Sequence, residues 1–256
     1  MNKRLNRAFT LTELLVVVSI IALLIAILLP ALSSARKSAY DLSCKSSIRQ
    51  WTIAWFAYAT DHDEQPVQSW HHTDEIQPTG EHWYIYIRDY MNNGETLVLA
   101  CPTAGEPLST SSNSRGTASR NWFPSAADHF GATEDHIGGY GYNNWWSESN
   151  NTRNKPQHIK TISDAAEPTD IPVFFDCTWA DVGWVLEADP IPPPGDREDP
   201  EASGVGGWIK RVSMNRHGGD TVNLSMADGS TVSSAVDDLL GFAWHNDWDE
   251  SLVSNR

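Results

Sequence analysis

Phe9-Thr10-Leu11-Thr12-Glu13-Leu14-Leu15 opens the stretch that decides the fold of this chain. The stretch covers 9–29 and reads FTLTELLVVVSIIALLIAILL, in which Glu13 is the only charged residue. These 21 residues, as a helix, span about 31 Å, the thickness of the hydrocarbon core of a bilayer. An ionised carboxylate at that depth costs about 2.5 kcal/mol or more, so Glu13 indicates a functional role rather than a plain anchor.

A short basic leader precedes this stretch. Residues 1–8 carry three cations and end on the small residue Ala8. Cleavage after Ala8 would create a new amine on Phe9, about one helical turn from Glu13. The alternatives are an ordinary secretory signal, with 31–35 imitating its cleavage site, and an uncleaved anchor. Neither needs a Glu near the start of its apolar segment, and ordinary signals have only about 7–15 apolar residues.

The leader and the apolar stretch together resemble the class III signal of type IV pilins and type II secretion pseudopilins. In that family a prepilin peptidase removes the leader and the new N-terminus is methylated, which implies cleavage after Ala8 and methylation of Phe9. The family's fifth mature residue, here Glu13, pairs with the terminal amine of a neighbouring subunit. Pro30 matches the family's helix-weakening proline and is expected to kink or loosen the helix. The usual residue before the cut is Gly, and Ala8 departs from it.

The composition separates the N-terminal segment from the remainder. The chain has 256 residues and a formal net charge of −15, and its strong apolarity lies before residue 30. An acidic surface argues against nucleic-acid binding, because phosphate contacts need Lys and Arg. The expected organisation is a leader at 1–8, a membrane and spine helix at 9–60, and a β-rich globular head at 61–256.

The helix is expected to continue beyond the membrane. An apolar stripe at spacings of four and three residues predicts a helix face packed on a sheet. The predicted fold class is therefore α+β, a long helix on an antiparallel sheet, which is the type IV pilin fold that the resemblance implies. The stripe consists of Cys44, Ile48, Trp51, Trp55 and Tyr58.

The head is expected to be rich in loops. Residues 83–90 favour a short helix over a strand, and 140–145 and 171–176 read as strands. Residues 189–207 carry five prolines and several acids, which predicts an exposed, irregular excursion.

A hairpin is expected near the C-terminus. Residues 222–226 alternate between apolar and polar, which predicts a half-buried strand, and Asp228-Gly229 is a turn signal. A three-residue loop with Gly229 in the left-handed conformation pairs Val232 with Leu224 on the buried face. A two-residue loop would shift the register by one residue and expose Val232.

His217, Asp228 and Gly229 resemble the C-terminal H-x9-DG signature of a large pilin-like group, although ten residues separate His217 from Asp228. An acid–base pair is one interpretation of the two residues. A structural role is favoured, with His217 bonded to loop backbone and Asp228 making the turn, because no nucleophile accompanies them. No enzymatic activity is expected. Other segments that agree with the group include Cys44, Tyr58, Cys101-Pro102, Tyr140-Gly141-Tyr142-Asn143 and Trp244-His245.

The three cysteines are Cys44, Cys101 and Cys177. An envelope location permits disulfides, and the odd count leaves at least one cysteine unpaired within the chain. Cys44 with Cys101 is the preferred bridge, and Cys101 with Cys177 stays open. No two cysteines form a C-x-x-C pair, so no zinc motif is recognised and no metal ligand is assigned.

No cofactor is required by this interpretation. Calcium is a minor candidate, because major pseudopilins of type II secretion commonly bind it in a C-terminal loop. Hard oxygen ligands are available, although none falls in an EF-hand pattern. They belong to Asp176, Asp181, Asp228, Asp237 and Asp238.

The predicted function is that of a structural filament subunit, a pilin or a pseudopilin. It would be a single-pass inner-membrane precursor and then a periplasmic or cell-surface filament. Its expected partners are identical or homologous pilin subunits, a prepilin peptidase and methyltransferase, and an inner-membrane assembly platform. The 12 tryptophans favour an aromatic core. Their alternative role is sugar stacking by an adhesin or carbohydrate-binding head, and an anchored enzyme acting through His217 is a third hypothesis.

Overall fold

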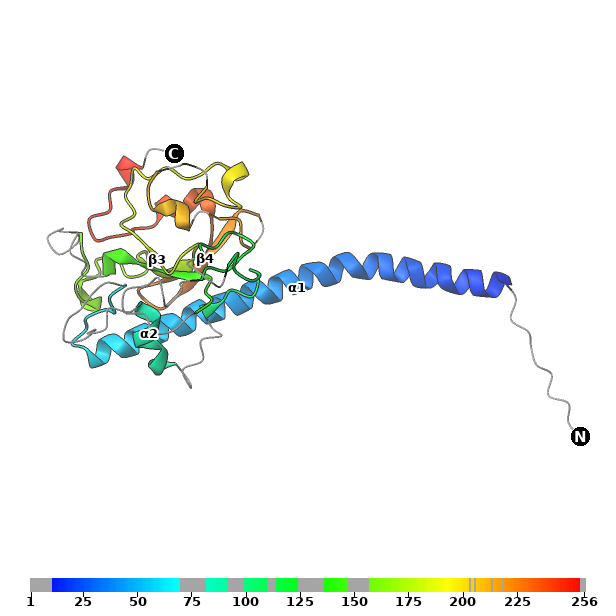
Figure 1. Ribbon diagram of the computed structural model, residues 1–256, viewed down its shortest axis with the longest axis horizontal. Coiled ribbons are helices and arrows are strands. Elements are labelled where there is room, and N and C mark those ends of the chain that lie inside the picture. The colour runs from blue at the N-terminus through cyan, green and yellow to red at the C-terminus, as the bar shows by residue number, and fades with distance from the viewer. Residues whose placement is uncertain are drawn as a thin grey trace, which may run out of the picture. The chain divides into compact units, whose positions relative to one another are not determined.

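The computed structural model contains one long helix and a five-stranded sheet (Figure 1). Helix α1 spans Leu11–Asp61, and the chain divides into two compact units, 1–40 and 41–256. The described residues are 11–69, 82–91, 99–109, 114–123, 136–146, 157–202, 204, 206–212, 214–217 and 219–253.

The first unit contributes the apolar part of α1. Its described residues, 11–40, are helical and exposed. Leucine and alanine favour the helix, and the many Val and Ile residues lower its intrinsic stability only slightly, because one χ1 rotamer stays available to each. The helix continues through Pro30, so the loosening expected there does not end it.

The second unit uses the remaining turns of α1 as its spine. The five residues of the predicted stripe, from Cys44 to Tyr58, are all buried, which confirms the helix face read from their spacing. The short helix expected at 83–90 is also confirmed, as α2 (Trp83–Ile87) followed by the 3-10 turn η1 (Arg88–Tyr90). Trp83 packs edge-on against Trp51, with ring centroids 5.1 Å apart, and so fixes α2 against the spine.

The sheet has the strand order β3-β1-β2-β4-β5. The α+β class is confirmed, with one difference from the antiparallel sheet that was predicted. β1 and β2 are antiparallel, and the chain reverses again between β2 and β3. β3 then pairs with the edge of β1 that lies away from β2, so β1 and β3 are parallel. The strands are β1 (Tyr140–Asn143), β2 (Pro172–Asp176), β3 (Asp181–Val182), β4 (Thr221–Met226) and β5 (Thr231–Ala235).

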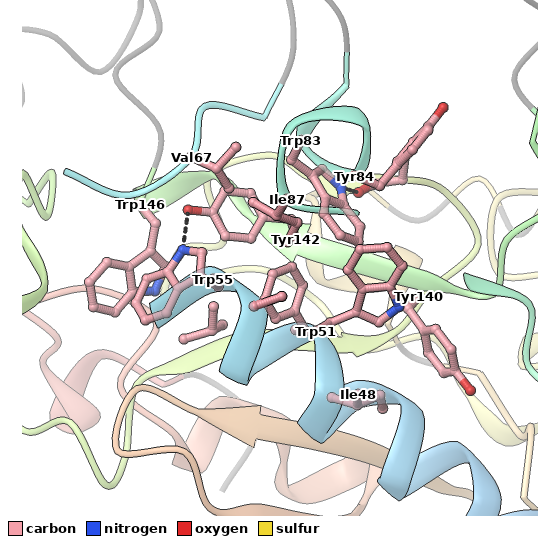
Figure 2. Packing of buried hydrophobic residues seen from close by; sticks show 14 of the residues in the cluster. Ile48, Trp51, Trp55, Val67, Trp83, Tyr84, Ile87, Tyr140, Tyr142 and Trp146 are labelled. Atoms are coloured by element: carbon pink, nitrogen blue, oxygen red, sulfur yellow. Dashed lines mark hydrogen bonds between the residues drawn. The ribbon is translucent and has the colours of Figure 1, made fainter. Parts of the chain in front are cut away.

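Both faces of the sheet are covered. The face toward α1 holds an aromatic core, in which the indole of Trp55 donates a hydrogen bond to the Tyr142 hydroxyl at 3.2 Å (Figure 2). The opposite face carries a second core that includes Leu224 and Trp244. Short 3-10 turns complete the head, at η4 (Asn144–Trp146), η5 (Ile162–Asp164), η6 (Pro194–Asp196), η7 (Ile209–Arg211), η8 (Val236–Gly241) and η9 (Glu250–Leu252).

The C-terminal hairpin has the predicted register. Leu224 pairs with Val232, and Gly229 adopts a left-handed backbone with φ of 85°, so the three-residue loop is confirmed. The half-buried character expected of β4 was wrong, because the polar residues of this central strand face α1 instead of solvent. The hydroxyl oxygens of Ser225 and Thr52 lie 2.7 Å apart, and the Asn223 amide donates to Asp41 at 2.9 Å.

The excursion at 189–207 is irregular, as predicted, but it is not wholly exposed. Asp189 is buried and accepts hydrogen bonds from the backbone N–H groups of Trp208 and Ile209. Arg197 is also buried and forms ion pairs with Asp220 and Asp237. Two charged side chains therefore anchor the excursion to the head.

Candidate functional site

The N-terminal part of α1 holds the described residues of the predicted assembly site. Glu13 lies in the first described turn of the helix, and Pro30 lies within it. Ala8 and Phe9, the predicted cleavage and methylation residues, lie outside the described residues. The helix is long and apolar enough to cross a membrane by length and composition.

The large apolar side chains of this part of α1 are exposed. Leu24 is 54% exposed, and the other large apolar residues from Leu11 to Leu32 are similarly uncovered. An exposed apolar surface of this length is unfavourable in water, so it needs lipid or another protein surface to cover it.

A second set of candidate residues meets inside the head. Cys44 lies on α1, Cys101 follows a turn at 99–100, and their sulfur atoms are 2.7 Å apart. The predicted partners are thus brought together, and both are buried free thiols in the structure. The disulfide itself stays a prediction. Cys177 lies in the core on the opposite face of the sheet.

His217 joins the two cysteines. Its ring Nε2 is 2.8 Å from the Asp176 carboxylate at the end of β2, and the same oxygen accepts the backbone N–H of Asn223. The expected bond from His217 to loop backbone was wrong, because the imidazole reaches a buried carboxylate instead. Asp228 takes the other predicted role, since its carboxylate accepts the N–H of Ser230 in the hairpin turn.

The electrostatics of this cluster follow from its burial and its charges. Burial opposes a proton on His217, but Asp176 and Cys101 outweigh it and raise the imidazole pKa to about 10. Burial raises the pKa of the Asp176 carboxyl, and His217 offsets part of that rise. Burial also disfavours a thiolate at Cys101, yet Cys44, His217 and Arg216 hold its pKa below the usual range.

Cys44 responds in the opposite direction. Its interaction with Cys101 and its burial both raise the pKa of the Cys44 thiol. Cys101 is therefore the thiol of the pair that loses its proton first.

Four of the five predicted calcium ligands have protein partners, among them Asp228 with the N–H of Ser230. Asp176 bonds His217, Asp181 forms an ion pair with Arg211 at 3.0 Å, and Asp237 pairs with Arg197. Calcium stays a prediction. Within the described part of the chain, the group of residues that could hold a metal ion is Cys44, Cys101 and His217.

Most of the described tryptophans form the cores, which confirms the interpretation favoured by the sequence. The fully buried ones include Trp145, Trp146 and Trp244. Trp208 is 37% exposed, and the Arg211 guanidinium lies 4.6 Å from its ring centroid. That contact occupies the ring that would best serve a sugar-stacking role.

Two residues of the cluster escaped the sequence analysis. Asp176 was considered only as a calcium ligand, and Asp41 was not considered, although its carboxylate lies 3.5 Å from His217 Nδ1. The position of Asp176, a carboxylate directly after four apolar strand residues, is the signal that could have indicated a buried partner.

The fold and the N-terminal segment define a class: α+β proteins whose head is built on an N-terminal helix of membrane length. Residues 3–29 match the family model of the prokaryotic N-terminal methylation motif. This match shows a prepilin-type methylation motif at the N-terminus and supports a likeness to type IV pilins. Searches of curated proteins and of solved structures give no significant match.

Proposed function

We propose that this protein is a filament subunit of a type IV pilus-like or secretion pseudopilus fibre, assembled through residues 9–40 of its N-terminal helix. The observation that supports the proposal best is the long uncovered apolar helix with a single carboxylate near its start. The methylation motif at 3–29 adds that this end of the chain is a prepilin-type substrate.

The helix suits two successive environments. In the membrane, lipid covers its apolar side chains. In a filament, the same side chains pack against the helices of neighbouring subunits, so no new surface has to be created on extraction. The precursor would be an inner-membrane protein, and the assembled form would lie in the periplasm or at the cell surface.

Glu13 supplies the register of assembly. Cleavage after Ala8 by a prepilin peptidase would expose the amine of Phe9, and Glu13 of one subunit would neutralise the amine of the next. A buried ion pair contributes more to specificity than to net stability, because desolvation of both charges offsets much of their attraction. Loss of one partner leaves an unpaired charge, which is strongly destabilising.

The test is Glu13→Val in cells that carry the native assembly machinery. Sheared filaments should fall at least 10-fold, since about 1.4 kcal/mol already corresponds to a factor of ten. The membrane precursor should stay at its normal level. The matched control is Ser19→Val, a polar-to-apolar change in the same helix, whose hydroxyl bonds only the Leu15 carbonyl at 2.7 Å.

The readouts are the mass of sheared subunit and its N-terminal sequence, which should begin at Phe9. Normal filament yield from Glu13→Val would remove the proposed mechanism. A surface subunit that retains Met1 would remove the proposed processing.

A further inference from the structure

The chain brings three metal-ligating side chains together from segments far apart in sequence. Cys44 belongs to α1, Cys101 to the segment before β1, and His217 to the approach to β4. One ligand atom from each lies within 4.8 Å of the others. Both cysteines are fully buried, and the His217 side chain is only 2% exposed.

The His217 ring is arranged like a histidine that binds a metal through one nitrogen while a carboxylate holds the other nitrogen. Its Nε2 is held by the Asp176 carboxylate, which leaves Nδ1 as the ring atom available to the two sulfurs. Among the described atoms, Nδ1 is buried and makes no hydrogen bond of good geometry. Metal-bound histidines commonly use their second nitrogen in this way, because a carboxylate fixes the ring and raises its basicity.

A disulfide accounts for only part of this arrangement. It would join Cys44 to Cys101 and leave Nδ1 of His217 with the Asp41 carboxylate, 3.5 Å away, as its polar neighbour. A metal ion uses all three groups. Two thiolates and an imidazole form a ligand set that suits soft or borderline cations such as Zn²⁺ and Cu⁺, whereas Ca²⁺ and Mg²⁺ prefer oxygen.

We propose that Cys44, Cys101 and His217 bind a thiophilic cation, Zn²⁺ or Cu⁺, with Asp176 as the positioning residue of His217. With metal–sulfur distances of about 2.3 Å, a tetrahedral ion separates its two sulfurs by about 3.8 Å. The thiols, now 2.7 Å apart, therefore turn away from each other on binding. Binding releases the protons held by the thiols and the imidazole.

Asp41 marks the open side of the site. It lies on α1 one turn before Cys44, its side chain is 29% exposed, and its carboxylate is 3.5 Å from Nδ1. Its carboxylate accepts the Asn223 amide at 2.9 Å and pairs with Lys45 at 2.9 Å, so it contributes negative charge beside the site. The bound ion would tie α1, the segment after 99 and the approach to β4 to one another.

The experiment uses the full-length protein, purified reduced in detergent without chelators and tested with Zn²⁺ and, as a spectroscopic probe, Co²⁺. The wild type should bind about one equivalent, with a sulfur-to-cobalt charge-transfer band, and Zn²⁺ should raise its Tm. Cys44→Ser and Cys101→Ser should each lose at least 90% of that band. The matched control, Cys177→Ser, also removes a buried thiol and should keep the band.

Three results would overturn the proposal. One is a reduced wild type that binds neither ion and has the same Tm with and without chelator. Another is equal cobalt spectra for Cys44→Ser and Cys177→Ser. The third is native protein from the cell envelope that contains a Cys44–Cys101 disulfide and no metal. Because the chelator is applied to the wild type, a variant that fails to fold does not leave the question open.

Discussion

The two parts of α1 differ in what covers their apolar side chains. Leu24, in the first part, is 54% exposed, whereas Trp55, in the second, is fully buried. The second part has an alternation of polar and apolar positions that matches its own head, and the first part is apolar on every side. The second part of the helix is covered by the chain's own head, whereas the first part needs lipid or another protein surface to cover it.

Substitution of one large residue in each part of α1 should test this difference most clearly. Trp55→Ala removes an edge contact to Trp146, with centroids 5.0 Å apart, and the hydrogen bond to Tyr142. We expect it to lower the free energy of unfolding of the head by about 3–5 kcal/mol. Leu24→Ala should leave that free energy unchanged and should instead reduce filament yield.

Denaturant unfolding followed by tryptophan fluorescence, together with sheared-filament yield, measures both effects. If Leu24→Ala destabilises the head as much as Trp55→Ala does, the two parts of the helix do not have separate partners.

A double-mutant cycle at the polar contact between α1 and β4 sharpens the comparison. Thr52→Val removes the hydroxyl 2.7 Å from Ser225 Oγ, which keeps its contacts with Phe174, so the loss should be about 1–1.5 kcal/mol. Adding Ser225→Ala removes both hydroxyls and should recover part of that loss, with a coupling of about 1 kcal/mol. Chemical denaturation of the four proteins gives the coupling. Strict additivity would mean that the two hydroxyls do not interact.

The smallest effect is expected at the turn of the hairpin. Gly229 has φ of 85°, and a Cβ there would meet only the Phe56 ring at an ordinary 3.6 Å. Gly229→Ala should therefore cost about 1 kcal/mol from backbone strain alone. Gly195→Ala is the matched control, because its Cβ meets open space without a left-handed backbone. Equal melting temperatures for the two variants would contradict the strain argument.

Local periodicity explains what the sequence predicted well. The stripe from Cys44 to Tyr58 and the pairing of Leu224 with Val232 each depend on a repeat of a few residues. Both can therefore be predicted without knowledge of the rest of the fold. The N-terminal motif is equally local, because helix length, charge and leader lie within 30 residues of each other.

Other features depend on long-range pairing and could not be read in this way. The partner of His217 is Asp176, 41 residues away, and Cys44 meets Cys101 across 57 residues. The lack of a C-x-x-C pair discouraged any metal assignment, but ligands from distant segments need no such spacing. Asn223 and Ser225 looked solvent-facing because alternation alone does not show that a helix covers the polar face.

That polar face has a mechanical consequence. A pull along α1 would act on the Thr52–Ser225 and Asp41–Asn223 contacts, which join the helix to β4. A slide by one helical turn, about 5.4 Å, would separate both pairs and part the buried Thr52, Asn223 and Ser225 side chains from these partners. A purely apolar interface has no such hydrogen-bonded pairs, so it would resist a slide along the helix less than this polar one does.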